Sequence, residues 1–300
     1  MNEPKYVGNF GSNVPNTGPG LSPMVWKDYR ASSLTSGDVP GFFKKWDFID
    51  FKSSTNVNAA EAYWADGLMV FGSDGFAITN GSDHTSASTT GKALGTVTIG
   101  SDGDNEGGYL RQACAPVRAT GLNATAASRS GNWVLEARLR TSTIADTKHN
   151  IFFGVMEDVA ATAIIPITAL GALADKNLIG FHRPESARST AGTGGAIMNA
   201  VSKADGQTAV THQTDALTLV ADTYMKLALR YDAAAGTIYW YANGVLVASE
   251  YIDPTAGGST TYGYFPNDIN LGWICGVLNA TGSTPGTVTL DWVAMAAQTP

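Results

Sequence analysis

The chain has 300 residues and a formal net charge of −7, from 19 Lys and Arg against 26 Asp and Glu. The acidic balance argues against a nucleic-acid partner, because binding a polyphosphate requires a cationic face. Charged residues make up only 15% of the chain, and 34 glycines and 12 prolines punctuate it, which favours many short strands and turns. A chain of this length can bury a large core without disulfides or metals.

Targeting signals and cysteines point to an intracellular site of synthesis. The first residues carry no basic patch before an apolar core, and no apolar run approaches the roughly 18 residues of a spanning helix. We therefore expect a soluble protein made in a cytoplasm, with no membrane partner. Cys114 and Cys275 each lie in an apolar strand-like run. We predict two free thiols there, with a single bridge as the alternative.

Residues 1–45 differ from the rest of the chain. Prolines and glycines interrupt them repeatedly, and no period of 2 or 3.6 defines a packed face. This composition predicts an extended arm. Its large aromatic residues are costly to leave in water, so they must lie on the chain's own domain or on a neighbour. The candidate interface residues are Trp26, Tyr29, Phe42 and Phe43.

From Trp46 the pattern becomes that of β-strands. Strands are predicted, in chain order, near 46–51, 68–71, 75–79, 95–99, 109–114 and 133–140. Residues 133–140 alternate most clearly, with Trp133 and Leu135 on a face toward the core. Glu136 and Arg138 lie on the other face, which we expect to meet water.

The segment from 224 to 251 predicts a three-stranded antiparallel meander. A turn follows Asp232, and Asn243-Gly244 favours a two-residue type I′ hairpin, which needs positive φ at both positions. A last strand is predicted at 287–295. Between Glu157 and Lys176 an Ala-rich stretch predicts one short helix.

The predicted strands resemble those of the concanavalin A-like (laminin G-like) jelly roll. The resemblance is carried by Trp133–Arg140, Asn177–Phe181 and above all Leu227–Gly244, and it covers residues 46–297. It implies an all-β fold, a two-sheet antiparallel jelly-roll sandwich over residues 46–300, with an extended N-terminal arm over 1–45.

A second resemblance concerns the arm. Gly18–Tyr29 followed by Gly41–Phe48 is similar to the leader that precedes such jelly rolls in structural proteins of tailed bacteriophages. It implies a non-enzymatic virion protein assembled in the host cytoplasm, a capsid decoration or cement protein. Its partners would be the major capsid protein and neighbouring copies of itself, as a homo-oligomer on the capsid surface.

The alternative is a carbohydrate-binding, lectin-like module of a phage tail or fibre, with surface glycans as partners. Tyr239 and Tyr241 alternate with Trp240, so one set faces the core and the other a surface. That surface could stack on sugar rings or on a neighbouring subunit, or pack within the sandwich.

Catalytic carboxylates were sought as the mark of a glycosidase. Retaining glycosidases of this fold carry a Glu-x-Asp-x-x-Glu strand, which places two carboxylates about 5 Å apart, and no segment matches it. Glu136 and Asp291 each stand alone on a strand, and we interpret them as solvated, outward carboxylates. We predict no enzyme, although carboxylates from separate strands could still converge.

Metal and cofactor sites are not expected. Asp102, Asp104 and Glu106 have the spacing of a calcium loop, but Ala113 stands where an EF-hand needs Glu, leaving a loose surface calcium site or a solvated turn. The four histidines show no zinc spacing.

Overall fold

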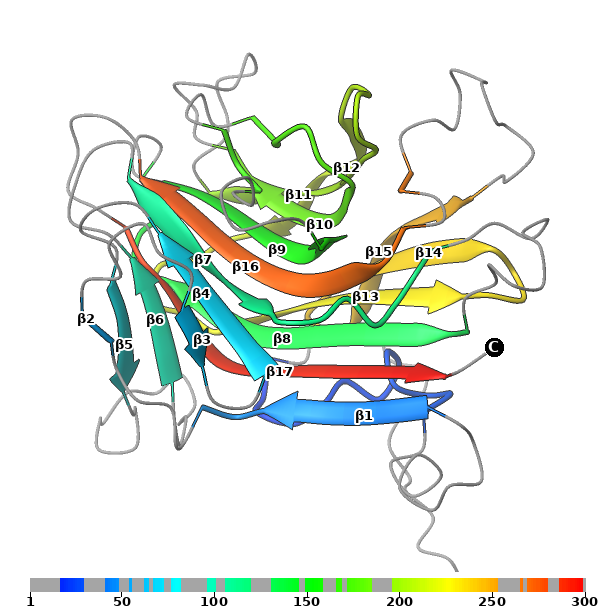
Figure 1. Cartoon of the computed structure of the whole chain (residues 1–300), viewed down its shortest axis with the longest axis horizontal. Helices are drawn as coiled ribbons and strands as arrows, with labels where there is room; N and C mark the ends of the chain where they lie inside the picture. The colour runs from blue at the N-terminus through cyan, green and yellow to red at the C-terminus, as the bar shows by residue number, and fades with distance from the viewer. Residues whose placement is uncertain are drawn as a thin grey trace, which may run out of the picture.

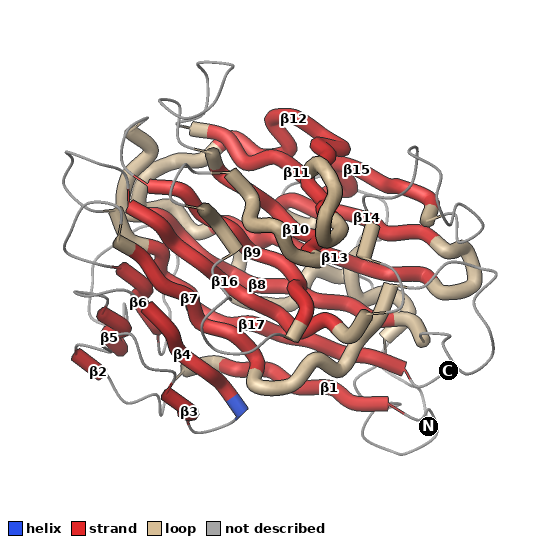
Figure 2. Tube along the Cα trace, turned by 45° about the horizontal axis from the view of Figure 1, so that its top comes forward, coloured by secondary structure: helices blue, strands red, loops and turns tan. Residues whose placement is uncertain are grey.

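A computed structural model describes residues 17–29, 41–48, 54–55, 62–64, 67–72, 77–81, 96–100, 106–119, 131–145, 149–158, 166–168, 172–184, 196–252, 265–266, 269–279 and 286–298. Strands dominate these ranges (Figure 2). The described part of the chain holds no helix long and apolar enough to cross a membrane.

Two antiparallel sheets stack as layers (Figure 1). The nine-stranded sheet has the order β15-β14-β13-β8-β17-β6-β5-β2, with β1 also paired to β17. Its strands are β1 (Gly41–Trp46), β2 (Ser54–Thr55), β5 (Ala77–Gly81), β6 (Thr96–Gly100), β8 (Trp133–Thr141), β13 (Met225–Asp232), β14 (Thr237–Ala242), β15 (Val245–Tyr251) and β17 (Val288–Gln298).

The eight-stranded sheet has the order β12-β11-β10-β9-β16-β7-β4-β3. Its strands are β3 (Ala62–Trp64), β4 (Leu68–Gly72), β7 (Gly107–Gln112), β9 (His149–Glu157), β10 (Leu178–Arg183), β11 (Ile197–Lys203), β12 (Val210–Thr218) and β16 (Leu271–Asn279). The chain crosses repeatedly between the sheets, as at β8 to β9 and β16 to β17. The predicted all-β sandwich of two antiparallel sheets is confirmed.

The main core lies between the sheets. Trp133 and Leu135 of β8 are fully buried there, as the alternation predicted, together with Phe153 of β9 and Trp273 of β16. The Trp273 ring meets that of Trp46 edge-on, with their centroids 5.4 Å apart. Large aromatic groups from both sheets therefore fill the interior.

The meander from β13 to β15 agrees with the sequence. Asn243 and Gly244 both have positive φ, at 50° and 79°, as a type I′ turn requires. In the preceding turn the Asp232 carboxylate accepts hydrogen bonds from the backbone N–H of Ala234 and Ala235, each 3.0 Å long. The turn residues thus fix the register of three neighbouring strands.

Two sequence expectations differ from the structure. Strand β1 pairs with β17 from Gly41 to Trp46, so the boundary predicted between residues 45 and 46 falls inside a strand of the sandwich. Strand β1 is short and contains two lysines, so its sequence does not show the alternation of apolar and polar residues that marks a strand. The helix predicted from Glu157 to Lys176 is wrong for the described residues, because Glu157 ends β9 and Ile167 forms an antiparallel bridge with Leu173. Residues 159–165 and 169–171 lie outside the description.

A close approach of β9 and β10 depends on two glycines. Gly154 lies directly opposite Gly180. A Cβ on Gly154 would stand 2.1 Å from the Ile179 carbonyl oxygen and 2.6 Å from the Gly180 Cα. Backbone atoms leave no room for a methyl group there.

We predict that Gly154→Ala lowers the free energy of unfolding by about 3 kcal/mol, because the two strands must move apart. Gly20→Ala is the matched control, since nothing lies within 4 Å of its added Cβ. Chemical denaturation measures both values, and equal stabilities for the two variants would contradict the prediction.

Candidate functional site

The outer face of the nine-stranded sheet is covered by residues 17–29, here named the strap. Figure 1 draws it in dark blue beside β17 and β1. Three backbone hydrogen bonds fold it on itself: Val25 and Trp26 donate to the Ser22 carbonyl, both at 3.1 Å, and Tyr29 donates to that of Trp26 at 2.9 Å. The strap forms one buried cluster with the sheet, whose members include Val25, Trp26, Tyr29, Val134, Ala228, Tyr241, Trp292, Ala294 and Ala296.

The structure brings three of the four candidate interface aromatics together. Trp26 and Tyr29 are each 7% exposed, and the Trp26 ring meets those of Tyr29 and Phe43 edge-on at centroid distances of 6.1 and 5.6 Å. Phe42 packs instead against the core between the sheets. In the single chain these side chains therefore lie on its own sandwich, and their role in an interface stays a prediction.

Glu136 is the centre of the strap contacts. The expectation that it is an outward, solvated carboxylate is wrong: it is fully buried on β8. Its Oε2 accepts hydrogen bonds from the backbone N–H of Ser22 at 3.0 Å and from Trp26 Nε1 at 2.6 Å. Burial raises the pKa of Glu136, while the Lys226 ammonium and these hydrogen bonds act in the opposite direction.

Two buried cations hold the first part of the strap. Arg138 donates through Nε to the Thr17 carbonyl at 3.0 Å and pairs through a second nitrogen with Asp291 at 2.5 Å. Lys226 Nζ donates to the Gly20 carbonyl at 2.7 Å, and burial lowers its pKa against the opposing effect of Glu136. Asp291, also expected to be solvated, is only 5% exposed.

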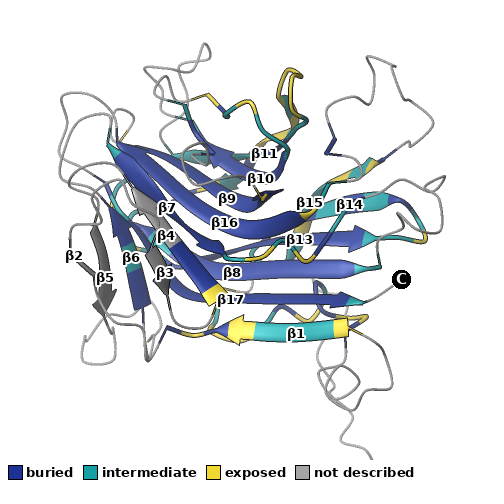
Figure 3. Cartoon of the chain, in the orientation of Figure 1, coloured by how far each residue is buried: buried dark blue, intermediate teal, exposed yellow. Residues whose placement is uncertain are grey.

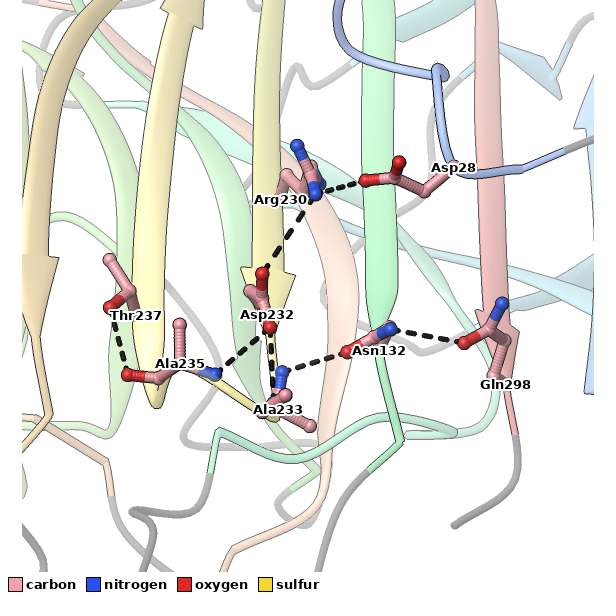
Figure 4. Close-up of polar contacts among 9 residues, drawn as sticks. Asp28, Asn132, Arg230, Asp232, Ala233, Ala235, Thr237 and Gln298 are labelled. Atoms are coloured by element: carbon pink, nitrogen blue, oxygen red, sulfur yellow. Dashed lines mark hydrogen bonds and ion pairs between the residues drawn. The ribbon is translucent and has the colours of Figure 1, made fainter.

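A further ion pair holds the last part of the strap. Arg230 of β13 pairs with Asp28, and its other acidic neighbour is Asp232, 4.0 Å away (Figure 4). In the same view Asn132 donates to Gln298 and accepts from the backbone of Ala233, which joins neighbouring ends of β8, β13 and β17. The strap is thus attached along its whole length to three adjacent strands.

The contact between strap and sheet is imperfect. Four buried polar atoms in it have no hydrogen-bond partner in the structure: Ser22 Oγ, Tyr29 Oη, Glu136 Oε1 and Trp292 Nε1. Each such atom costs about 1–3 kcal/mol relative to a satisfied one. The strap is therefore held specifically but less tightly than its contacts suggest.

Tyr239 and Tyr241 face the strap, whereas Trp240 faces the core, so the predicted alternation is confirmed. Tyr241 is buried in the strap cluster, and Tyr239 packs against it with the Arg230 guanidinium 5.7 Å from its ring. Trp240 Nε1 donates to the Gly180 carbonyl at 3.0 Å. Own-chain packing thus occupies the face that was weighed as a sugar-stacking surface.

A serine, a histidine and a glutamate meet where β11, β12 and β15 approach one another. Ser202 Oγ is 2.8 Å from His212 Nε2, and His212 Nδ1 is 3.6 Å from Glu250 Oε2, which is the order of nucleophile, base and acid. Ser202 is fully buried, however, and the imidazole stacks on Trp240 and Phe265 at 4.8 and 5.2 Å. Among the described residues these three join β11 and β12 at one edge of the eight-stranded sheet to β15 at the edge of the nine-stranded sheet.

The remaining sequence candidates are placed as follows. Cys114 is exposed and Cys275 buried, and both thiols are free; burial raises the pKa of Cys275 to about 12. Asp102 to Asn105 of the candidate calcium loop lie outside the described residues. Within the described ranges no group of three or more His, Cys, Asp or Glu could hold a metal ion.

No protein-family model and no curated protein matches the chain. Similar solved structures include a protein of unknown function from Shewanella oneidensis MR-1, with 12% identity, 94% of this chain and 96% of that chain covered, and a TM-score of 0.49. Peanut lectin has 12% identity, coverage of 86% and 97%, and a TM-score of 0.47. A carbohydrate esterase from the Shiga toxin-encoding bacteriophage phi24B has 14% identity, coverage of 77% and 90%, and a TM-score of 0.42. Because binding proteins and enzymes both occur among them, neither activity follows from the likeness.

We predict that Glu136→Ala opens the strap, because it leaves Ser22 N and Trp26 Nε1 without an acceptor and Lys226 without its counter-charge. A loss of about 3 kcal/mol raises the population of opened strap by roughly a hundredfold. Trypsin cleavage after the exposed Lys27 measures this population. Glu136→Gln, which keeps an acceptor oxygen, is the control; equal cleavage of Glu136→Ala and wild type would contradict the prediction.

We also predict a pH dependence from His212. Burial lowers the pKa of His212 to about 4 from the ordinary imidazole value of about 6.5. The folded state therefore disfavours the charged imidazole, and stability is lost as the pH falls from about 6.5 toward 4, by about 3 kcal/mol. Urea denaturation at a series of pH values compares wild type with His212→Gln. Parallel curves for the two proteins over this window would exclude the assignment.

Proposed function

We propose that the chain is a non-enzymatic structural protein of a tailed-phage virion, a capsid decoration or cement protein attached to the shell by residues that precede the strap. The observation that carries this proposal is the anchoring of the strap at its first described residue. Arg138 binds the Thr17 carbonyl and is itself held by Asp291. The point at which the described part of the chain begins is thereby held at the centre of the nine-stranded sheet.

The place of the anchors supports a tether. They come from β8 and β13, which are adjacent, almost fully buried strands (Figure 3). Lys226 adds a second attachment at Gly20, and Glu136 a third at Ser22. A pull on residues 1–16 is therefore shared among several charge-assisted hydrogen bonds before it reaches β1.

A carbohydrate-binding module of a phage tail or fibre is the second candidate, and one surface feature favours it. A shallow surface hollow, too small to enclose a ligand, lies where β7, β9 and β16 meet at one end. At its margin Arg111 pairs with Asp158 at 2.7 Å, and the buried Gln112 Oε1 has no hydrogen-bond partner in the structure. A guanidinium beside a carboxylate and an amide can bind neighbouring sugar hydroxyls.

Removing residues 1–16 tests the leading proposal. We expect the shortened protein to keep a cooperative thermal transition, because the strap and β1 remain, and to lose attachment to phage particles in a co-sedimentation assay. Cutting after residue 40 would remove the strap as well, so we expect that variant to lose stability.

Undiminished particle binding by the shortened protein would contradict attachment through the arm. A glycan array then separates the second candidate: binding that Asp158→Ala abolishes would favour the carbohydrate module over the structural protein.

A further inference from the structure

We propose that Cys114 is a site of reversible oxidation to a sulfenic acid, which the neighbouring Gln112 side chain stabilises. The oxidant is hydrogen peroxide, and the modified group is an S–O–H held by the two polar atoms of one amide. Both residues line the hollow at the ends of β7, β9 and β16. The inference concerns a modification site and stands independently of attachment to a virion.

The two cysteines of the chain differ in accessibility. Cys114 follows the end of β7 and is exposed, whereas Cys275 lies fully buried in the main core. Burial raises the pKa of Cys275 to about 12, so this side chain stays a protonated thiol. Peroxide oxidises the thiolate form of a cysteine that solvent can reach. Of the two sulfur atoms, Cys114 Sγ is therefore the one open to oxidation.

The Gln112 amide lies beside this sulfur. Its Nε2 donates to Cys114 Sγ at 3.5 Å. The side chain is 6% exposed, and its Oε1 is buried without a hydrogen-bond partner in the structure. The amide thus presents an unused acceptor next to the sulfur that its nitrogen already contacts.

A sulfenic acid provides the donor that this acceptor lacks. A thiol S–H is a weak donor, whereas the O–H of a sulfenic acid is a strong one. One oxygen added to Cys114 Sγ brings that O–H to Gln112 Oε1, while Nε2 still donates to the modified group. Because an unsatisfied buried acceptor is costly, this pairing favours the oxidised form. The hollow is too small to enclose a ligand, but the modification adds a single oxygen atom at an exposed thiol.

The oxidation balances with peroxide alone. The Cys114 thiol first releases its proton, and the thiolate sulfur then attacks one oxygen of hydrogen peroxide. The S–O bond forms as the O–O bond breaks, and the second oxygen leaves as hydroxide, which takes up the released proton to give water. Sulfur loses two electrons, and the peroxide gains them.

The location of the second cysteine determines how the oxidation is reversed. Sulfenic acids condense with an accessible thiol, but Cys275 is the only other cysteine in the sequence and is fully buried. A small thiol from solution therefore has to reduce Cys114. The first thiol molecule forms a mixed disulfide and releases water. The second restores the Cys114 thiol and leaves as the disulfide of the two small molecules.

Trapping with dimedone, a 1,3-dione that adds to sulfenic acids, tests the proposal on the full-length chain. Peroxide is added and then destroyed with catalase, dimedone is added after increasing delays, and peptide mass spectrometry measures the trapped fraction. We expect the wild-type sulfenic acid to persist about fivefold longer than that of Gln112→Leu, which lacks the amide. Gln112→Asn, whose amide is one methylene shorter, should lose most of this gain and covers the case in which leucine disturbs the fold.

A matched control moves the thiol to another exposed position. Cys114→Ser combined with Ser249→Cys places an exposed cysteine on β15, away from Gln112. Its sulfenic acid should be as short-lived as that of Gln112→Leu. Recovery of the unmodified wild-type mass after treatment with a small thiol should show that the oxidation is reversible.

Three results would overturn the proposal. The first is an equal lifetime of the sulfenic acid in wild type and in both Gln112 variants, with circular dichroism confirming that all are folded. The second is oxidation of wild-type Cys114 directly to sulfinic acid with no trapped sulfenic acid. The third is trapping at Cys275 to the same extent as at Cys114, since it would mean that accessibility does not select the site.

Discussion

The structure depends on the burial of charged residues on a sheet face that alternation alone would give to water. Glu136, Arg138 and Lys226 lie on the outer side of β8 and β13, and all three are almost fully covered. An isolated buried charge is costly, and the sheet supplies opposite charges: Asp291 pairs with Arg138, and Glu136 and Lys226 act on each other. The strap supplies further hydrogen-bond partners, the carbonyl oxygens of Thr17 and Gly20 and the N–H groups of Ser22 and Trp26, and these contacts determine its place on the sheet.

The fold was predictable because its signals are local. Alternation in 133–140 gave the inner face of β8, and Asn243-Gly244 gave the hairpin between β14 and β15 with the positive φ values that the turn needs. The burial of Glu136 was not predictable in this way, because its partners Ser22 and Trp26 lie more than a hundred residues away in the chain. Periodicity reports the face on which a residue lies, but not what covers that face.

The same limit explains the candidate site. The sequence indicated that the aromatic residues of the strap must be buried, either against a neighbouring protein or against the chain's own domain. In the single chain Trp26 packs on its own domain, where it contacts Glu136 and Phe43. Strand β1 was missed because two lysines follow Phe43 and interrupt the alternation of apolar and polar residues. In the structure these lysines lie over the Trp46 and Trp292 rings, but in the sequence they look like part of a polar linker.

The charges beneath the strap contribute more to its position than to its affinity. Burial raises the pKa of Glu136 and lowers that of Lys226, so burial under the strap favours the neutral form of each side chain over its charged form. Linkage gives the sign for Glu136: docking is tightest below the ordinary pKa of a glutamate and weakens as the pH rises from there through the raised pKa. A purely apolar strap would bind more tightly but could slide along the sheet. Fixed hydrogen bonds at Thr17, Gly20 and Ser22 allow one register only.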